Sequence, residues 1–357
     1  MPAIYNSGAV FANSGHKASN VTGWLRVMSS PMNGPTGEES RVVVVLLLEQ
    51  FAMLALAATV EPLREANSVA RRALYRWQVV SHDGHPVRAS NGLTLNVDAS
   101  IGDIRACDMV IVVSSFDPQI HTHSVMLGWL RRLARQGTAT GAVETGAYVL
   151  AKAGLLDHYK ATIHWENMDS FVDEFPKVRM TGRLFEIDRQ RFSASGAAAA
   201  MDMMLHFIAQ HAGRPVAAAV AEEFIYNRMR GPEVPQRLDA SARLGTTNPR
   251  MKRLLAKLET RLEDRVTVAQ MAASECISER ELRRLFRTHA RISPQAYHRK
   301  IRLEKARNML RQTALPIADV ALQCGFSSAS DFARAFRREF GFTPAAERAN
   351  IGGAGGP

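Results

Sequence analysis

The last hundred residues contain one sequence nearly twice, and this near-repeat constrains the fold more than any other feature of the chain. The first copy spans 267–294 (TVAQMAASECISERELRRLFRTHARISP) and the second spans 316–344 (PIADVALQCGFSSASDFARAFRREFGFTP), at an offset of 49 to 50 residues. The positions that match are apolar, as with Phe286 and Phe336. Such self-similarity indicates that one supersecondary unit is used twice.

Each copy has the pattern of two short helices joined by a tight turn. The first helix carries a small residue at its centre, Ala272 in one copy and Ala321 in the other. The second helix begins at a serine that can cap it, Ser278 in the first copy and Ser327 or Ser328 in the second. This layout predicts a helix-turn-helix, whose second helix places its N-terminal residues against base edges in the major groove of DNA.

The segment between the copies, 294–312, has the period of one amphipathic helix. Its expected inward residues are Tyr297, Ile301, Leu303, Ala306 and Leu310, and its expected outward residues are Arg299, Lys300, Arg302, Lys305, Arg307 and Arg311. About 19 residues at ~1.5 Å each give roughly 28 Å, close to the ~34 Å between successive major-groove faces. One chain is therefore expected to place two helices in adjacent grooves.

The excess of basic over acidic residues is confined to this part of the sequence. Residues 250–348 hold 21 Lys and Arg against 11 Asp and Glu, a net charge of +10 out of +11 for the whole chain. A basic excess of this kind is expected on a surface that neutralises phosphates, because each phosphate contact releases condensed counterions. Charge alone is equally compatible with a solvated, Arg-rich helical surface, and the repeat favours the nucleic-acid interpretation.

This C-terminal segment resembles the DNA-binding domain of the AraC/XylS family over about one hundred residues. The signature of the family's second unit is carried by Ala318, Ala321, Gly325, Phe326, Ser327, Phe332, Phe336, Phe340, Gly341 and Pro344. The resemblance implies an all-α domain at 249–348, in which two helix-turn-helix units are joined by the long helix. It also implies double-stranded promoter DNA and RNA polymerase as partners, and transcriptional activation as the usual outcome.

Twelve residues of the two second helices are the candidates for DNA contact. They are Ser278, Glu279, Arg280, Arg283, Arg284, Arg287, Ser328, Ser330, Asp331, Arg334, Arg337 and Arg338. Arg is the commonest reader of guanine, but the same group also binds phosphate, so phosphate contact or plain solvation stays open for each residue. The apolar residues between them are expected in the core: Leu282, Leu285, Phe286, Phe332, Phe336 and Phe340.

The part of the chain from 41 to 230 has the pattern of an α/β sandwich. Short Val- and Ile-rich runs bounded by turn residues alternate with amphipathic segments, as expected for strands buried in a mainly parallel sheet. Residues 1–40 show no period and are expected to form a disordered arm, and 349–357 a flexible tail. The Pro- and Gly-rich segment 231–248 is expected to be a linker between the two domains.

Residues 138–165 indicate a strand, an abrupt turn and a helix. This segment resembles the nucleophile elbow of the class I glutamine amidotransferase-like fold of PfpI type, which is often joined to an AraC-type domain. Enzymes of that fold carry a cysteine at the elbow, whereas this chain has Glu144. A carboxylate is a poor replacement for a thiolate in amide chemistry, so the sequence predicts a domain that is not an enzyme. The nearest likeness is to regulators of arginine, glycine betaine and carnitine catabolism.

The crevice beside the elbow is a candidate site for a small cationic metabolite. Its expected lining residues are Ser114, Ser115, Glu144, Thr145, His164 and Trp165. A carboxylate would pair with the charge of such a ligand, and an indole would offer a cation–π face. Two alternatives stay open: Glu144 only caps the helix while Trp165 only packs, and His164 is a hydrogen-bonded structural residue.

The sequence thus predicts a ligand-responsive transcriptional regulator that acts as a homodimer. Its three cysteines have no close pairing and the longest early apolar run, 42–48, is too short for a bilayer, so we expect a cytoplasmic protein without a membrane partner. No spacing of His, Cys or carboxylates indicates a metal site, and no cofactor is expected. The alternatives are an amidohydrolase or protease with an appended DNA module, and a scaffold whose α/β domain only dimerises.

Overall fold

The computed structural model describes residues 40–237, 239–313 and 315–351. Residues 41–223 form a domain built on a seven-stranded sheet with strand order β10-β11-β7-β6-β1-β2-β5. All neighbouring pairs in this sheet are parallel except β10 and β11. The strands are β1 (Arg41–Leu47), β2 (Tyr75–Ser81), β5 (Ala99–Ser100), β6 (Met109–Ser114), β7 (Ala139–Glu144), β10 (Phe185–Asp188) and β11 (Arg191–Ala194).

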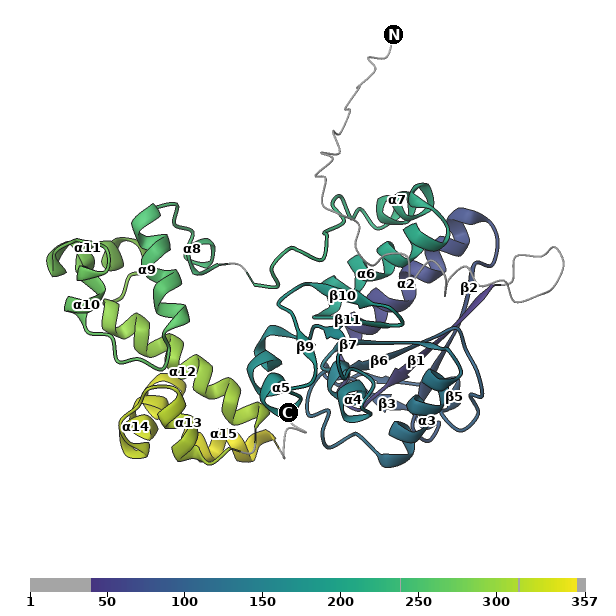
Figure 1. Cartoon of the computed structure of the whole chain (residues 1–357), viewed down its shortest axis with the longest axis horizontal. Helices are drawn as coiled ribbons and strands as arrows, with labels where there is room; N and C mark the ends of the chain where they lie inside the picture. The colour runs from purple at the N-terminus through teal and green to yellow at the C-terminus, as the bar shows by residue number, and fades with distance from the viewer. Residues whose placement is uncertain (1–39, 238, 314, 352–357) are drawn as a thin grey trace, which may run out of the picture. The chain divides into compact units, whose positions relative to one another are not determined.

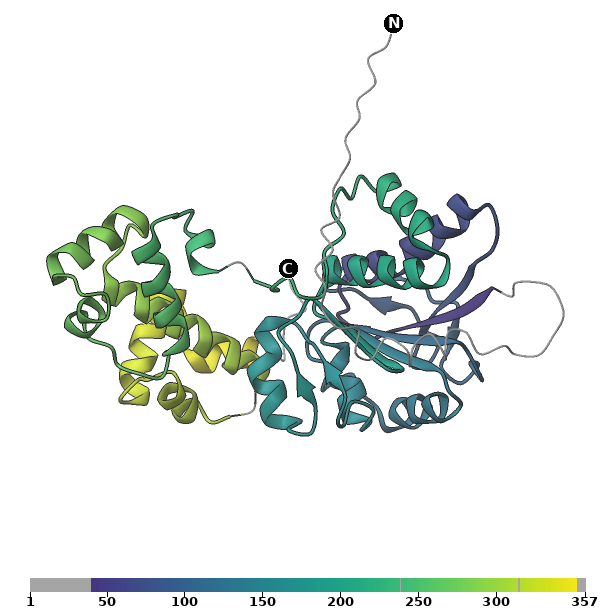
Figure 2. The ribbon, with the colours of Figure 1, turned by 45° about the horizontal axis from the view of Figure 1, so that its top comes forward.

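Helices cover both faces of this sheet, as expected for strands that are apolar on both sides (Figures 1 and 2). One face carries α2 (Met53–Ala70), α6 (Ala197–His211) and α7 (Arg214–Glu223). The other carries α3 (Ser124–Arg135), α4 (Gly146–Lys152) and α5 (Met168–Glu174). The central strand β6 is buried along its whole length, so the core lies on both sides of the middle of the sheet. The α/β sandwich with a mainly parallel sheet is confirmed.

Some edge elements of this domain were not predicted from the sequence. The antiparallel hairpin of β10 and β11 adds two strands beside β7. The short segment after β2 forms a separate two-stranded ribbon of β3 (Val87–Arg88) and β4 (Thr94–Leu95) before it reaches β5. A second ribbon pairs β8 (Lys160–Ala161) with β9 (Arg179–Met180), and the single turn η1 (Trp165–Asn167) lies between these two strands in the sequence.

The C-terminal part is entirely helical. Its helices are α8 (Ala240–Arg243), α9 (Pro249–Thr260), α10 (Val268–Ala273), α11 (Glu279–His289), α12 (Pro294–Gln312), α13 (Ile317–Gln323), α14 (Ala329–Phe340) and α15 (Pro344–Ile351). They enclose two separate cores, one around Leu282 and Phe286 and the other around Phe332 and Phe336. Helix α12 takes part in both, through Tyr297 in the first core and residues such as Leu303 in the second.

The boundaries expected from the sequence need two corrections. The segment 231–248 is not a plain linker, because it contains α8, whose Ala240 is buried in the first C-terminal core. The tail from 349 is helical as far as Ile351, the last residue of α15. The expected arm at 1–40 lies outside the described residues except for Ser40.

Candidate nucleic-acid interface and ligand site

Helix α11 is built as the second helix of a helix-turn-helix. Its N-cap is Ser278, whose hydroxyl oxygen accepts a hydrogen bond from the backbone N–H of Glu281 at 3.1 Å. The preceding helix α10 begins with a capping box between Thr267 and Gln270, which satisfies two backbone N–H groups that would otherwise lack partners. The start of each helix is therefore fixed by short-range hydrogen bonds.

Helix α14 repeats this arrangement in the second unit. Of the two serines that the sequence offered as caps, Ser328 takes the role, and its hydroxyl oxygen accepts from the N–H of Asp331 at 3.1 Å. At the other end, Gly341 closes the helix in the left-handed conformation with φ 86°. We call α11 and α14 the reading helices.

The outward faces of the reading helices carry the twelve candidate residues. Asp331 is half-buried, and the other eleven are exposed. Five of the six residues expected in the core are buried, and Phe340 packs against the second core as a partly buried ring. Ion pairs join Glu279 to Arg283 at 3.1 Å and Asp331 to Arg334 at 3.7 Å, so one acidic residue on each helix restrains an arginine one turn away.

The connecting helix α12 has the bounds that the sequence indicated, but two of its expected outward arginines contact the second core, Arg302 as a buried and Arg307 as a partly buried side chain. Arg302 is only 8% exposed, and its Nε donates to the carbonyl of Cys324 at 2.6 Å while its guanidinium lies over the ring of Phe326. Arg307 pairs with the buried carboxylate of Glu347 at 2.9 Å. Both side chains hold the second core together. They were assigned outward because a single amphipathic stripe does not describe a helix that contacts two cores.

The turn of each unit contains one residue with positive φ, at equivalent positions of the repeat. In the second unit this is Gly325 with φ 71°, and in the first it is Cys276 with φ 54°. A Cβ on Gly325 would lie 2.5 Å from the carbonyl oxygen of Glu263, so this turn requires glycine for space as well as for conformation. The first turn has room for a side chain, since it is made with a cysteine.

In the α/β domain, Glu144 lies at the elbow between β7 and α4. Its φ of 59° is in the left-handed region, which β-carbon-bearing residues seldom adopt, so the backbone is strained at this point. A Cβ on the following Gly146 would lie 2.3 Å from the carbonyl oxygen of Val112, so the turn can be this tight only with glycine there. The abrupt strand-turn-helix predicted from the sequence is thus present in the structure.

The Glu144 carboxylate is mostly enclosed by the protein. Its Oε1 accepts from the backbone N–H of Ala197 at 3.1 Å, at the start of α6. Burial raises the pKa of this carboxyl to about 7, although the hydrogen bond from Ala197 acts in the opposite direction. A carboxyl that titrates near neutrality changes charge readily when a cation approaches it. The helix end that Glu144 caps is therefore the start of α6 and not that of α4.

Ser114 is the neighbour of Glu144 on the adjacent strand β6, where the two residues are in register. The Ser114 side chain is fully buried, and its Oγ is one of the buried polar atoms of the described residues that have no hydrogen-bond partner. Thr145, in contrast, donates its hydroxyl hydrogen to the carbonyl oxygen of Ser115 at 2.6 Å. Thr145 and Ser115 therefore fix the shape of the elbow, whereas Ser114 still has capacity for a polar partner.

His164 and Trp165 come from the segment before α5 and reach the same side of the elbow. A Cβ built on Gly196 would have both the Glu144 carboxylate and the His164 ring within 4 Å, so these two groups flank Gly196. Burial lowers the pKa of His164, which keeps the ring neutral at pH 7. The rings of His164 and Trp165 are 5.5 Å apart, and the guanidinium of Arg237 lies 4.3 Å from the Trp165 ring centroid. The structure thus places His164 beside Glu144, and Trp165 contacts His164 on one side and Arg237 on the other.

Three functional or structural residues were missed from the sequence. Gln236 and Arg237 lie in the segment expected to be a linker, and Glu347 lies in a helix turn without an obvious core pattern. Arg237 gave no local signal, since its partner Trp165 is 72 residues away in the chain. For Glu347 the sequence does offer a signal, because a single carboxylate in the last helix of an arginine-rich segment is expected to pair with arginine.

Comparisons with known proteins divide the chain in the same way. The DJ-1/PfpI family matches residues 41–210, and a helix-turn-helix domain family matches residues 271–350. Among the described residues, no helix is both long and apolar enough to cross a bilayer, and no group of three His, Cys, Asp or Glu side chains is placed to hold a metal ion.

Several curated relatives are similar over both parts. The HTH-type transcriptional regulator GbdR of Pseudomonas aeruginosa is 41% identical over 314 residues, which cover 88% of this chain and 86% of that protein. The regulator CdhR of the same organism is 40% identical over 85% of this chain and 90% of its own length. The regulator ArgR is 36% identical over 85% of this chain and 91% of its own length.

Proposed function

The chain belongs to the AraC-type transcriptional regulators that carry an N-terminal DJ-1/PfpI domain. From this we propose that the helical part binds DNA and that the α/β domain binds the effector. The reading helices contact DNA through their outward faces, with bases read near the serine caps and phosphates bound further along. The α/β domain binds a small nitrogenous metabolite and does no chemistry, since the elbow has a carboxylate instead of a thiol.

The observation that supports the DNA assignment is the exposure of both reading helices on the basic part of the chain. The arginines Arg280, Arg283, Arg284 and Arg334 are exposed, while the apolar faces beneath them are buried. The long helix α12 measures about 28 Å from ~1.5 Å per residue, which suits two contacts one turn of DNA apart. Both features fit one chain that contacts two adjacent major grooves.

The DNA assignment is tested by comparing a promoter fragment with bulk DNA at physiological salt. Arg283→Ala and Arg334→Ala should each lose about 1–3 kcal/mol on the promoter if they contact base edges, and much less on bulk DNA. Arg261→Ala is the matched control, because Arg261 is exposed in the same domain but pairs with Asp264 outside the reading helices. Equal losses on both DNAs would show that these arginines only bind phosphate, and no preference of the wild type for any promoter would refute sequence-specific binding.

For the ligand site, we propose a small organic cation, such as a quaternary ammonium or guanidinium compound, beside Glu144. The single observation that carries this is the enclosed Glu144 carboxylate on the tight elbow at the carboxyl edge of the sheet, where α/β folds bind ligands. The neutral ring of His164 adds a polar contact and the Trp165 ring adds a cation–π face, while the unpartnered hydroxyl of Ser114 lies buried next to Glu144 on β6. Glycine betaine, carnitine and L-arginine are the compounds to test first.

Binding is measured from the shift in unfolding temperature of the full chain with each compound. All four tryptophans, at 24, 77, 129 and 165, precede the helical part, so tryptophan fluorescence follows the N-terminal part of the chain. A ligand at one hundred times its Kd should stabilise by about 2.7 kcal/mol, and Glu144→Gln should abolish that gain. Glu222→Gln, an exposed carboxyl on α7, is the control. No shift with any compound would favour a domain that only dimerises, and a turnover that depends on Glu144 would favour the amidohydrolase.

We further propose that the protein acts in the cytoplasm as a homodimer that activates transcription through contact with RNA polymerase. Contact with RNA polymerase and activation are what the resemblance to the AraC/XylS family implies, and the cytoplasm fits three cysteines without close pairing. Sedimentation with and without promoter DNA tests the dimer, and transcription in vitro with purified RNA polymerase tests activation.

A further inference from the structure

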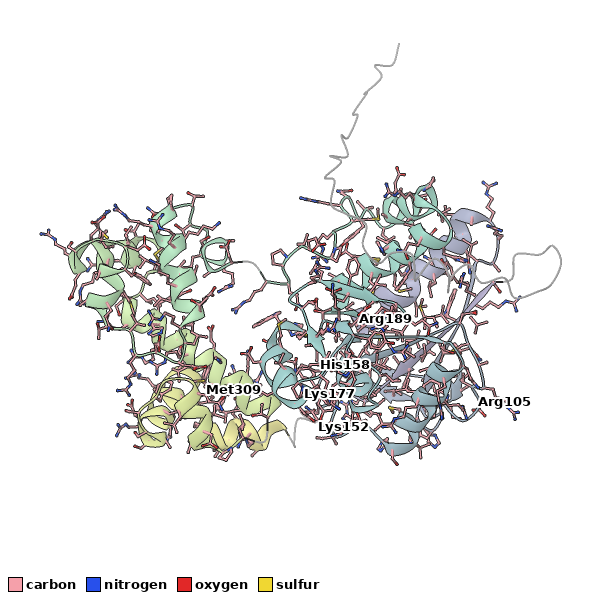
Figure 3. The ribbon with its side chains drawn as sticks, viewed as in Figure 1. Arg105, Lys152, His158, Lys177, Arg189 and Met309 are labelled. Atoms are coloured by element: carbon pink, nitrogen blue, oxygen red, sulfur yellow. The ribbon has the colours of Figure 1, made fainter. Side chains whose placement is uncertain are left out.

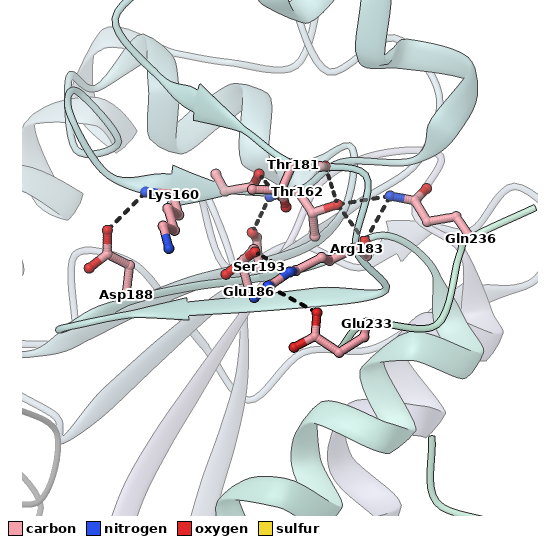
Figure 4. Close-up of polar contacts among 10 residues, drawn as sticks. Lys160, Thr162, Thr181, Arg183, Glu186, Asp188, Ser193, Glu233 and Gln236 are labelled. Atoms are coloured by element: carbon pink, nitrogen blue, oxygen red, sulfur yellow. Dashed lines mark hydrogen bonds and ion pairs between the residues drawn. The ribbon is translucent and has the colours of Figure 1, made fainter. Parts of the chain in front are cut away.

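The segment 231–237, which we call the strap, is fastened to the α/β domain (Figure 4). The N–H of Leu184 donates to the carbonyl of Pro232 at 3.1 Å, and Arg183 forms an isolated antiparallel bridge with Pro235. Arg183 also pairs through its guanidinium with Glu233 at 2.9 Å. The chain therefore does not leave the α/β domain at the end of α7 but remains attached for the length of the strap.

Gln236 fixes the end of the strap to the segment that leads to Trp165. Its Nε2 lies 2.8 Å from Thr162 Oγ1, 2.9 Å from the Arg183 carbonyl oxygen and 3.1 Å from the Ile163 carbonyl oxygen (Figure 4). Thr162 is fully buried, and its own N–H donates to Ser193 Oγ at 2.8 Å. This amide thus holds the strap to a buried segment beside β11, two residues before His164.

The next residue, Arg237, stacks on Trp165. Its guanidinium carbon is 4.3 Å from the centroid of the indole ring, and the Arg237 side chain is otherwise exposed. An exposed arginine stacked on an aromatic ring gains little free energy, so this contact can be exchanged for another cation at small cost. The chain itself thereby supplies a cation to the aromatic face that the proposed function assigns to the ligand.

We propose that Arg237 is an internal occupant of the cation site and that the effector displaces it. This inference rests on the sensing function proposed above, because the competing ligand is the small organic cation. Once Arg237 leaves Trp165, the strap is held only by its contacts with Leu184 and Arg183 and by the Gln236 amide. Its complete release would add seven residues of tether, about 23–25 Å of reach at ~3.3–3.6 Å per residue. Two residues beyond Arg237, Asp239 caps α8 of the helical part, so displacement at Trp165 changes how that part is tethered.

The competition is tested by titrating the full-length protein with glycine betaine, carnitine and L-arginine by calorimetry. Arg237→Ala removes the occupant and should tighten binding about two- to fivefold, the amount expected for one exposed cation–π contact. Arg237→Lys keeps a cation and should stay near the wild type. Arg189→Ala is the control, since Arg189 (labelled in Figure 3) stacks at 3.6 Å on Tyr159 of the same domain, away from the site.

Release of the strap is followed by trypsin cleavage after Arg237, with the fragments identified by mass spectrometry. The bound compound should speed this cleavage, and Trp165→Ala should speed it without any compound. If a compound binds the wild type and Arg237→Ala equally, or binds the variant more weakly, the displacement is refuted while the sensing function stands. If no compound binds either protein, the sensing function fails and the displacement fails with it.

Discussion

The charge state of Glu144 offers a direct test of how the elbow is built. Burial raises the pKa of this carboxyl from its usual 4.5 to about 7 in the folded protein. Between pH 4.5 and pH 7 the folded state holds a proton on Glu144 that the unfolded state has lost, so the contribution of this carboxyl to stability is largest at pH 4.5 or below and is lost as the pH rises through 7. Replacement by the neutral glutamine removes this dependence.

The size of the effect follows from the shift. About 2.5 pKa units at ~1.36 kcal/mol each give roughly 3 kcal/mol, and partial solvent contact of the side chain reduces this to about 2–3 kcal/mol. At pH 8, Glu144→Gln should therefore be about 2–3 kcal/mol more stable than the wild type, whereas at pH 4.5 the two should be nearly equal. Gln keeps the shape of the side chain and can still accept from the Ala197 N–H.

The assay is urea unfolding followed by tryptophan fluorescence at several pH values. With a denaturant slope of ~1–3 kcal/mol per M, the midpoint of the variant should lie about 1 M above that of the wild type at pH 8. Glu222→Gln on the exposed face of α7 should change stability by less than about 0.5 kcal/mol at any pH. Parallel curves for Glu144→Gln and the wild type across this pH range would refute the view that the elbow carboxyl is destabilised in its charged form.

Three further results are expected. Gly325→Ala should lower the free energy of unfolding by about 1–3 kcal/mol and weaken promoter binding, whereas Cys276→Ala at the equivalent turn should be tolerated. Equal effects of the two substitutions would contradict the crowding at Gly325. Glu347→Gln should lower the free energy of unfolding of the helical part by about 1–3 kcal/mol, because it leaves Arg307 and Arg311 without their carboxylate partner. Thermal circular dichroism measures this loss. No change would mean that hydration of the two arginines replaces the ion pairs at no cost. The affinity for glycine betaine should rise about tenfold from pH 6 to pH 8 as Glu144 ionises, and a flat profile would exclude a contact with that carboxylate.

The helical part was predicted well from the sequence because the residues that define each helix lie close together in the chain, and the pattern occurs twice. The serine caps, the apolar spacing and the bounds of α12 all lie within a few residues of the features that encode them. The elbow was also predictable, since a strand, a tight turn and a helix follow one another directly. In both cases, short-range pattern and tertiary structure agree.

What could not be predicted depends on contacts between distant residues. A helical wheel places Arg302 on the outward face of α12. In the structure it is buried, because it donates to the carbonyl of Cys324. The strap looks like a flexible linker because its anchors, such as Thr162 and Arg183, lie more than fifty residues earlier. The pKa of Glu144 likewise depends on α6, whose approach to the elbow has no signature in the sequence.

The participation of α12 in both C-terminal cores has a consequence for the DNA that the protein can use. A flexible joint would let each unit find its own groove, but a continuous helix embedded at both ends fixes the rotation of one unit relative to the other. One additional base pair between the two contact sites turns the second groove by about 34–36° around the duplex. The stiffness of this one helix therefore sets the phase of the operator as well as its length, and genuine targets should tolerate base changes in the spacer far better than insertions into it.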